Sequence, residues 1–243
     1  MCPAAEEILG RLASQDSRIV PIAFHVDYFN KPWKDVFSDP LYSRRQWVYN
    51  EVYAKPKPEG FGLNYTPMLM IDGEQSVNGR EPAAALAAIR AARSRKPLAK
   101  LDARLDPAEN GRSATVTVDV SARSWRVVKR PLLLCAVLRE DGVVTNIPSG
   151  ENAGKALTAR FPARSTKFEF IELTQSAPVS RSFDFEIDPA WNRKALRLAL
   201  FVQDKQTAAV YQAADLPWRA APSKDATNLD AAPHSGTEKA SKR

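Results

Sequence analysis

The 243-residue sequence is poor in the side chains that build metal sites and disulfide frameworks, with two cysteines, Cys2 and Cys135, and two histidines, His25 and His234. Structural zinc sites usually take four such ligands in close pairs, so the sequence contains no recognisable metal-site pattern and we predict no cofactor.

A run of about 18 apolar residues is also missing, which excludes a membrane-spanning helix by hydropathy. No charged segment followed by an apolar one precedes the first predicted helix, so the chain as given is expected in the cytoplasm if Met1 is its true start.

Long runs of like charge are missing as well. The net charge of +7 reflects 35 basic against 28 acidic residues. The densest basic stretches, Arg90–Lys96 and Ala122–Arg130, are interleaved with a single aromatic residue, Trp125. Nucleic-acid-binding surfaces combine clustered basic residues with stacking aromatics, whereas solvated helix faces and strand edges routinely carry charges of this density. We therefore predict no nucleic-acid partner.

Residues 1–96 alternate between helical and strand-like patterns, which is typical of an α/β domain. Pro3 suits a first helical turn, and Ile8 and Leu12 recur behind it at helical spacing. The apolar run Ile19–Phe29 is typical of a strand buried on both faces of a parallel sheet. The remaining predicted elements are a helix after Asp39-Pro40, a hairpin of Met68–Ile71 and Gln75–Val77 that turns at Asp72-Gly73, and an alanine-rich helix with Pro82 in its first turn.

Beyond Pro97 the pattern changes to period-2 runs separated by turns. This pattern predicts an antiparallel β-sandwich domain over residues 97–218. From Arg219 the sequence has almost no large apolar residue, so residues 219–243 are predicted to form a disordered tail. The expected fold class is therefore α/β plus β.

Cys2 occupies the N-cap position of the first predicted helix. The positive end of the helix dipole and the free amides of the first turn favour a thiolate at this position. A reactive cysteine is therefore one interpretation. The alternative is a fraying residue near the end of the chain.

His25 and Asp27 stand two residues apart on the predicted strand, so their side chains would share one face near its carboxyl end. Folds of the α/β class place ligands and proton-handling groups at such edges, which makes the pair a candidate catalytic site. The alternative is a buried histidine that is satisfied by local hydrogen bonds. A hydrolase built on this pair would lack a nucleophile.

Several other conspicuous side chains are interpreted structurally. Cys135 lies on the apolar face of a predicted strand and is expected to be a small core residue. Glu151 and Asn152 are ligand candidates, but we favour them as caps of a short helix near Ala153. The tryptophans interpreted as core or interdomain packing residues are Trp33, Trp47 and Trp125.

Four parts of the sequence carry a resemblance to a known family. They are Cys2–Glu6 (CPAAE), Ile22–Phe29 (IAFHVDYF) followed by Trp33-Lys34-Asp35, Tyr65–Gly73 (YTPMLMIDG), and Ser149–Leu157 (SGENAGKAL) with Val202–Asp204 (VQD). These segments resemble the motifs of the thioredoxin-like family catalogued as domain of unknown function 1223. The resemblance extends over nearly the whole chain up to the predicted tail.

The resemblance implies a thioredoxin-like domain without its first strand and its nucleophilic cysteine. Cys2 would correspond to the second cysteine of the family's pair. Thr66-Pro67, whose peptide bond is usually cis in that fold, would hold the substrate strand. Family members usually begin with a signal peptide further upstream, so a longer form would be periplasmic or secreted.

Two functions follow from the residues and the resemblance together. The 243-residue chain itself is expected to be a redox-inactive binding or chaperone module, because Cys2 has no resolving partner within it. In a longer form it would be a thiol–disulfide oxidoreductase of the cell envelope. In either case the expected partner is an unidentified protein or thiol substrate.

Overall fold

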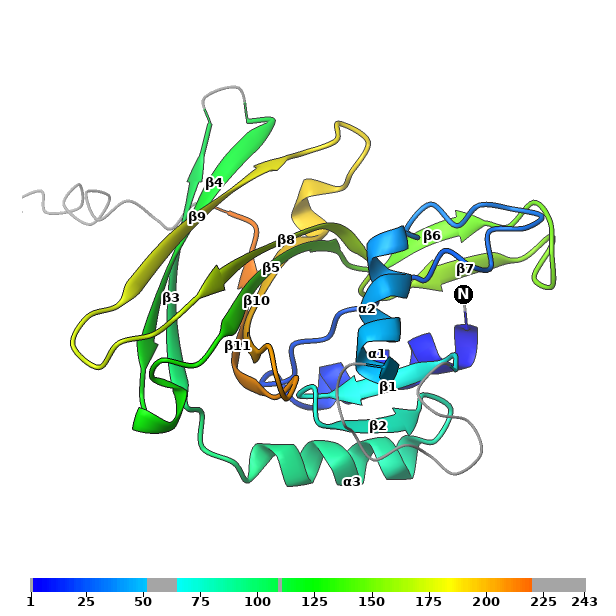
Figure 1. Cartoon of the computed structure of the whole chain (residues 1–243). Coiled ribbons are helices and arrows are strands. Elements are labelled where there is room, and N and C mark those ends of the chain that lie inside the picture. The colour runs from blue at the N-terminus through cyan, green and yellow to red at the C-terminus, as the bar shows by residue number, and fades with distance from the viewer. Residues whose placement is uncertain (1, 52–64, 109–110, 220–243) are drawn as a thin grey trace, which may run out of the picture.

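The computed structural model describes residues 2–51, 65–108 and 111–219. Within these ranges strands predominate over helices, and the paired strands are antiparallel (Figure 1). No helix in these ranges combines the length and the apolar character needed to cross a membrane.

The helices are α1 (Pro3–Gln15), α2 (Pro40–Glu51) and α3 (Pro82–Arg93), with 3₁₀ turns at Trp125–Val127 and Arg193–Ala195. The strands are β1 (Met68–Ile71), β2 (Gln75–Asn78), β3 (Ala99–Pro107), β4 (Ser113–Ala122), β5 (Leu132–Glu140), β6 (Val143–Asn146), β7 (Ala156–Ala159), β8 (Ala163–Ile171), β9 (Val179–Glu186), β10 (Leu196–Asp204) and β11 (Val210–Pro217).

Two antiparallel sheets share the largest apolar core. Their strand orders are β11-β10-β5-β8 and β3-β4-β9. Val116 and Val118 of β4 belong to the same buried cluster as Leu134 and Leu138 of β5 and Leu198 of β10. Alternate residues of each strand point inward, as the period-2 runs predict. The residues beyond Pro97 thus form the two packed sheets expected of a sandwich.

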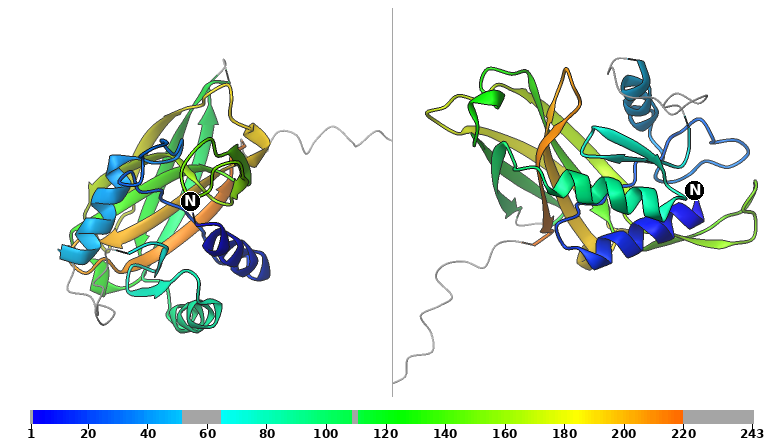
Figure 2. Two further views of the ribbon diagram at one scale, coloured as in Figure 1. Left: turned by 90° about the vertical axis from the view of Figure 1, so that its right-hand side faces the viewer. Right: turned by 90° about the horizontal axis from the view of Figure 1, so that it is seen from below.

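The β1–β2 hairpin lies between helices. Leu69 and Ile71 of β1 pack with α1 and α3, whereas Met68 and Met70 pack with Tyr49 of α2. Figure 2 shows α1 and α3 side by side, and Figure 1 shows α2 on the other side of the hairpin. The alternation along β1 therefore separates two helical layers. This is the smaller, helix-rich part of the molecule.

The strand expected over Ile19–Phe29 is not formed, so that prediction was wrong. The segment makes only isolated parallel bridges, at Ala23 and at His25. Val20 and Phe24 pack against the outer face of the β11-β10-β5-β8 sheet. A short apolar run indicates that a segment is buried but not which element covers it. Packing against the sheet therefore explains the apolar residues of this segment as well as strand pairing would.

A third apolar cluster joins the N-terminal half to the sandwich. It contains Tyr42 of α2 together with Cys135 of β5 and Phe201 of β10. The Tyr42 hydroxyl also lies 3.1 Å from the Oγ1 atom of Thr166. A domain boundary near Lys96–Pro97 stays a prediction, and the predicted tail beyond Arg219 lies outside the described residues.

The β6–β7 hairpin contains the SGENAGKAL stretch. Residues 151–154 form turns, so the short helix expected near Ala153 and its capping residues were predicted wrongly. Gly150 and Gly154 have φ values of +89° and +77°, which favour glycine and reverse the chain. The Gly154 amide then donates to the Ile147 carbonyl at 2.8 Å, which closes the loop.

Candidate functional site

An open cleft of about 570 Å³ lies between three segments of the N-terminal half. Its lining residues are Tyr28 and Phe29 from the loop before α2, Ser43, Gln46 and Trp47 from α2, and Tyr65 and Thr66 from the segment before β1. Tyr28, Phe29 and Trp47 are 53%, 64% and 51% exposed. Large aromatic residues gathered around one hollow are typical of a binding surface, whereas single exposed apolar residues need no explanation.

Gln46 fixes two walls of this cleft to each other. Its side chain is 6% exposed, its Nε2 atom donates to the Tyr65 carbonyl at 2.8 Å, and its Oε1 atom accepts from the Tyr28 hydroxyl at 2.8 Å. Burial of that hydroxyl raises the pKa of Tyr28, although the hydrogen bond to Gln46 acts in the opposite direction. The Tyr28 ring is thus exposed to the cleft while its polar end is held inside.

Helical spacing explains why α2 supplies one wall. Tyr42 and Tyr49, two turns apart, are buried against the sandwich and the β1–β2 hairpin. Ser43, Gln46 and Trp47 follow an i, i+3, i+4 pattern and line the cleft together. The sequence predictions missed Ser43 and Gln46 as site residues. This spacing was the signal that would have placed them beside Trp47.

Cys2 occupies the N-cap position of α1, and its side chain makes no capping hydrogen bond. Its thiol is free and partly exposed, and its carbonyl accepts from the Ala5 amide at 3.0 Å. Ala5 and Pro67 both approach Gly79, where an added Cβ would lie 3.2 Å from the Cβ of each. The first turn of α1 and Pro67 therefore both lie beside Gly79, and the Thr66-Pro67 peptide bond is cis.

His25 lies in a buried cluster between α1 and the loop that leads to α2. Its side chain is 8% exposed, with Nδ1 2.7 Å from Asp35 Oδ2 and Nε2 3.7 Å from Glu6 Oε1. Burial lowers the pKa of the imidazole, but hydrogen bonds and charges from both carboxylates outweigh this effect and raise the pKa to about 8. The other Glu6 oxygen accepts from the Arg160 backbone amide at 2.7 Å. The cluster thus joins α1, this loop and the residue that directly follows β7.

Asp27 and His25 do not share the strand face that the sequence predicted for them. The chain bends at Asp27, whose carboxylate accepts a hydrogen bond from the Ser43 hydroxyl of α2. The Asp27 amide donates to the same hydroxyl oxygen at 2.9 Å. Asp27 therefore supports a cleft residue, while Asp35 and Glu6 take the place beside His25. The sequence predictions did not anticipate either of these two partners.

The two thiols of the chain differ in accessibility. Cys135 is 2% exposed, and burial raises its pKa to about 11. The prediction of a core cysteine is therefore confirmed. Cys2 is the partly exposed thiol. In the described part of the chain, no group of three or more His, Cys, Asp or Glu side chains is placed to hold a metal ion.

Two tryptophans interpreted as packing residues are exposed. Trp47 is 51% exposed in the cleft, and Trp125 is 73% exposed in the 3₁₀ turn after β4. Trp33 is partly buried. A tryptophan in an amphipathic helix or in a turn can be buried or exposed. The residue type alone therefore did not decide between a packing position and an exposed one.

Comparison with known proteins bears on the fold. The structure of protein AGR_C_4864 from Agrobacterium tumefaciens matches with a TM-score of 0.62 at 17% identity, covering 91% of this chain and 90% of that chain. HBP35 of Porphyromonas gingivalis matches with a TM-score of 0.62 at 14% identity, covering 100% of this chain and 75% of that chain. No curated protein matches. A family model described as "Protein of unknown function (DUF1223)" matches residues 1–203.

Proposed function

The chain belongs to the DUF1223 family, and on that premise we propose that it is a thioredoxin-like binding module without redox turnover, which holds an extended apolar segment of a partner protein. The observation that carries this proposal is the cleft formed by Tyr28, Phe29 and Trp47 around the buried Gln46. Aromatic rings offer a large contact area and lose little conformational freedom on binding. Gln46 holds the tyrosine in place before a ligand arrives, which lowers the cost of ordering the site.

The surroundings of the β1–β2 hairpin support the thioredoxin-like part of the proposal. One helical layer contains α1 and α3, and the other contains α2. Thr66 lines the cleft, and Pro67 lies against the first turn of α1 through Gly79. A ligand in the cleft would therefore contact the segment that the family resemblance assigns to substrate binding.

The positions of the thiols support a module without turnover. A thiol–disulfide cycle needs a second thiol to release the mixed disulfide formed by the first. Cys135 is buried in β5, in the apolar cluster that includes Tyr42. Of the two cysteines in these 243 residues, Cys135 is therefore not accessible to release a mixed disulfide at Cys2.

Binding of a short fluorescein-labelled peptide with a central Phe-Leu-Phe tests the proposal, with a Ser-Gly-Ser version as the control peptide. We expect the apolar peptide to bind more tightly, because its side chains bury apolar surface in the cleft. Trp47→Ala should weaken binding at least ~10-fold, as loss of an aromatic anchor typically does. Trp125→Ala is the matched control variant, because Trp125 is exposed but does not line the cleft.

Fluorescence anisotropy titrations give the result directly. Equal affinities for the two peptides would overturn the proposal. So would equal weakening by Trp47→Ala and Trp125→Ala, because binding would then not depend on the cleft. Thermal unfolding of both variants by circular dichroism verifies that each remains folded.

A second candidate function, thiol–disulfide exchange in the cell envelope, is favoured by the position of Pro67, which neighbours Gly79 as does Ala5 in the first turn of α1. It requires a longer form with a second cysteine upstream of Cys2. The test is insulin reduction by that longer form and by the chain as given. Turnover confined to the longer form, and abolished by Cys2→Ser, would support exchange. Turnover by the chain as given would contradict the redox-inactive module.

A further inference from the structure

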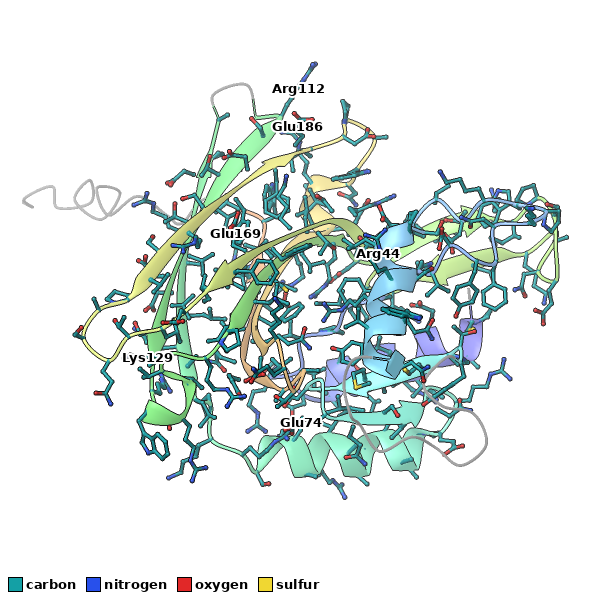
Figure 3. The ribbon with its side chains drawn as sticks, viewed as in Figure 1. Arg44, Glu74, Arg112, Lys129, Glu169 and Glu186 are labelled. Atoms are coloured by element: carbon teal, nitrogen blue, oxygen red, sulfur yellow. The ribbon has the colours of Figure 1, made fainter. Side chains whose placement is uncertain are left out.

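β8 is an edge strand of the β11-β10-β5-β8 sheet. Lys167, Phe168, Glu169 and Phe170 are all exposed, although the strand is buried again at Ile171. An edge strand presents one row of backbone N–H and C=O groups without a neighbour in the sheet. Exposure on both faces along this stretch leaves room for another strand to pair there. Glu169 is labelled on β8 in Figure 3.

The two phenylalanines form an apolar patch on this edge. Phe168 and Phe170 are 46% and 56% exposed, and their rings meet edge to face at 6.4 Å. In the β5–β8 register Phe168 lies opposite Cys135, so both phenylalanines point to the face that carries α2. The contact between Tyr42 and Thr166 is the neighbouring part of the same face. The patch is therefore the exposed continuation of an apolar surface that α2 covers further along the same face.

The charges on the other face of β8 are self-complementary. Among the ion pairs of the described residues, none involves Lys167 or Glu169, although the Lys167 Nζ lies 5.7 Å from the ring of the buried Phe185. If two β8 strands pair antiparallel about a twofold axis at Phe168, each Lys167 faces the Glu169 of the other strand. Registers centred on Lys167 or on Glu169 would instead set like charges against each other on the axis.

From these observations we propose that β8 is an interface for a second copy of this chain, paired antiparallel with Phe168 at the twofold axis. The lysine on an exposed edge discourages pairing with an arbitrary strand, whereas the same sequence run in the opposite direction supplies the matching charge. Phe168 would pack on its symmetry mate, and Phe170 would extend the apolar contact toward Thr166 of the other strand. The interface is short, so the dimer should depend on concentration. It goes beyond the proposed function, because none of the cleft residues belongs to β8.

Sedimentation velocity of the full chain over a range of concentrations tests the pairing. We expect the mass to rise from the 26.9 kDa of one chain toward twice that value. Lys167→Glu and Glu169→Lys should each raise the dimer dissociation constant at least ~10-fold, because each variant places like charges opposite one another. An equimolar mixture of the two single variants should dimerise again, since each chain then supplies the charge that the other needs.

Phe168→Asp should also abolish dimerisation by placing two carboxylates on the axis. Val144→Asp is the matched control, since Val144 is 62% exposed on β6 and lies outside the interface. A chain that stays monomeric at all concentrations would overturn the proposal. So would a dimer that survives Phe168→Asp, or two single variants that fail to dimerise when mixed although each remains folded by circular dichroism.

Discussion

Gln46 and His25 are buried polar side chains that each connect segments distant in the sequence. Gln46 joins α2 to the Tyr28 loop and to Tyr65, and His25 joins α1 to the loop that contains Asp35. A buried polar group is costly unless it is hydrogen-bonded, so such residues accept few alternative arrangements. They therefore fix the positions of the cleft walls rather than adding apolar contact.

His25 should make the free energy of unfolding depend on pH. Burial opposes protonation, but Asp35 and Glu6 raise the folded-state pKa from 6.5 to about 8. Because the folded pKa lies above the unfolded one, this stabilisation is fully present below about pH 6.5 and is lost as the pH rises to about 8. The difference in pKa corresponds to about 2 kcal/mol. Urea unfolding at pH 6 and pH 9 should show a decrease of that order.

His25→Asn should remove this decrease, since asparagine does not titrate. His234→Asn, at the other histidine of the sequence, is the control and should retain it. A wild-type free energy of unfolding that is equal at both pH values would contradict the assignment. Retention of the full decrease in His25→Asn would do the same.

Among the elements, the hairpin turns hold the helical layers against the sandwich. The Asp72 carbonyl in the β1–β2 turn accepts from the Val210 amide at 2.8 Å, next to the β10–β11 turn. Gln203 donates to the Tyr49 hydroxyl and to the Ala208 carbonyl, each at 2.7 Å. The VQD motif therefore has a clear structural role, because its glutamine links α2 to the turn that carries Ala208. Figure 3 shows Glu74 in the β1–β2 turn at this side of the hairpin.

A side chain at Gly73 should destabilise the protein at this contact. Its φ is +67°, and an added Cβ would lie 1.8 Å from the Ala208 carbonyl oxygen, so the turn would have to move away from the sandwich. Gly142 is the matched control, with a φ of +73° and nothing within 4 Å of an added Cβ. Gly142→Ala should cost about 1–2 kcal/mol from backbone strain, and Gly73→Ala about 1–3 kcal/mol more from overpacking. Urea unfolding measures both, and equal costs would show that the turn contact contributes nothing.

At the scale of the whole molecule, two apolar cores are connected by a third. The sandwich core and the cluster around α1, α3 and β1 contain separate sets of residues. The third cluster takes Tyr42 from the N-terminal half and Phe201 from the sandwich. Arg45 of α2 extends this contact, because its guanidinium lies 5.2 Å from the Phe201 ring and donates to Gln203 at 3.1 Å. The halves are therefore expected to stabilise each other even though each has its own core.

Cleavage of the chain between the halves tests this expectation. A recognition site for a specific protease inserted at Lys96–Pro97 should be cut readily, because Arg95 and Lys96 are exposed. After cleavage the fragments should remain associated through the third cluster and elute together in size-exclusion chromatography. Arg45→Met should promote their separation, whereas Arg44→Met, at an exposed position of the same helix, should not. Immediate separation of the unsubstituted fragments would contradict a stabilising contact.

Local periodicity in the sequence predicted many of the helices and strands. The helices that begin at Pro3 and Pro82 were predicted, and so was the hairpin that turns at Asp72-Gly73. Cys135 in the core was predicted as well. These features depend on neighbours a few residues apart, where propensity, turn chemistry and alternating apolar residues act together. The family motifs added the identity of the chain, which no periodicity could supply.

Only the tertiary structure decided what covers the Ile19–Phe29 run and which residues meet in the cleft. The run packs on the outer face of a sheet, because apolar periodicity encodes burial but not the identity of the covering element. Asp35 and Glu6 meet His25, and Gln46 meets Tyr28, through packing of segments far apart in the chain. Such contacts follow from how complete layers fit together, since each polar partner is specified by position in space and not by spacing in sequence.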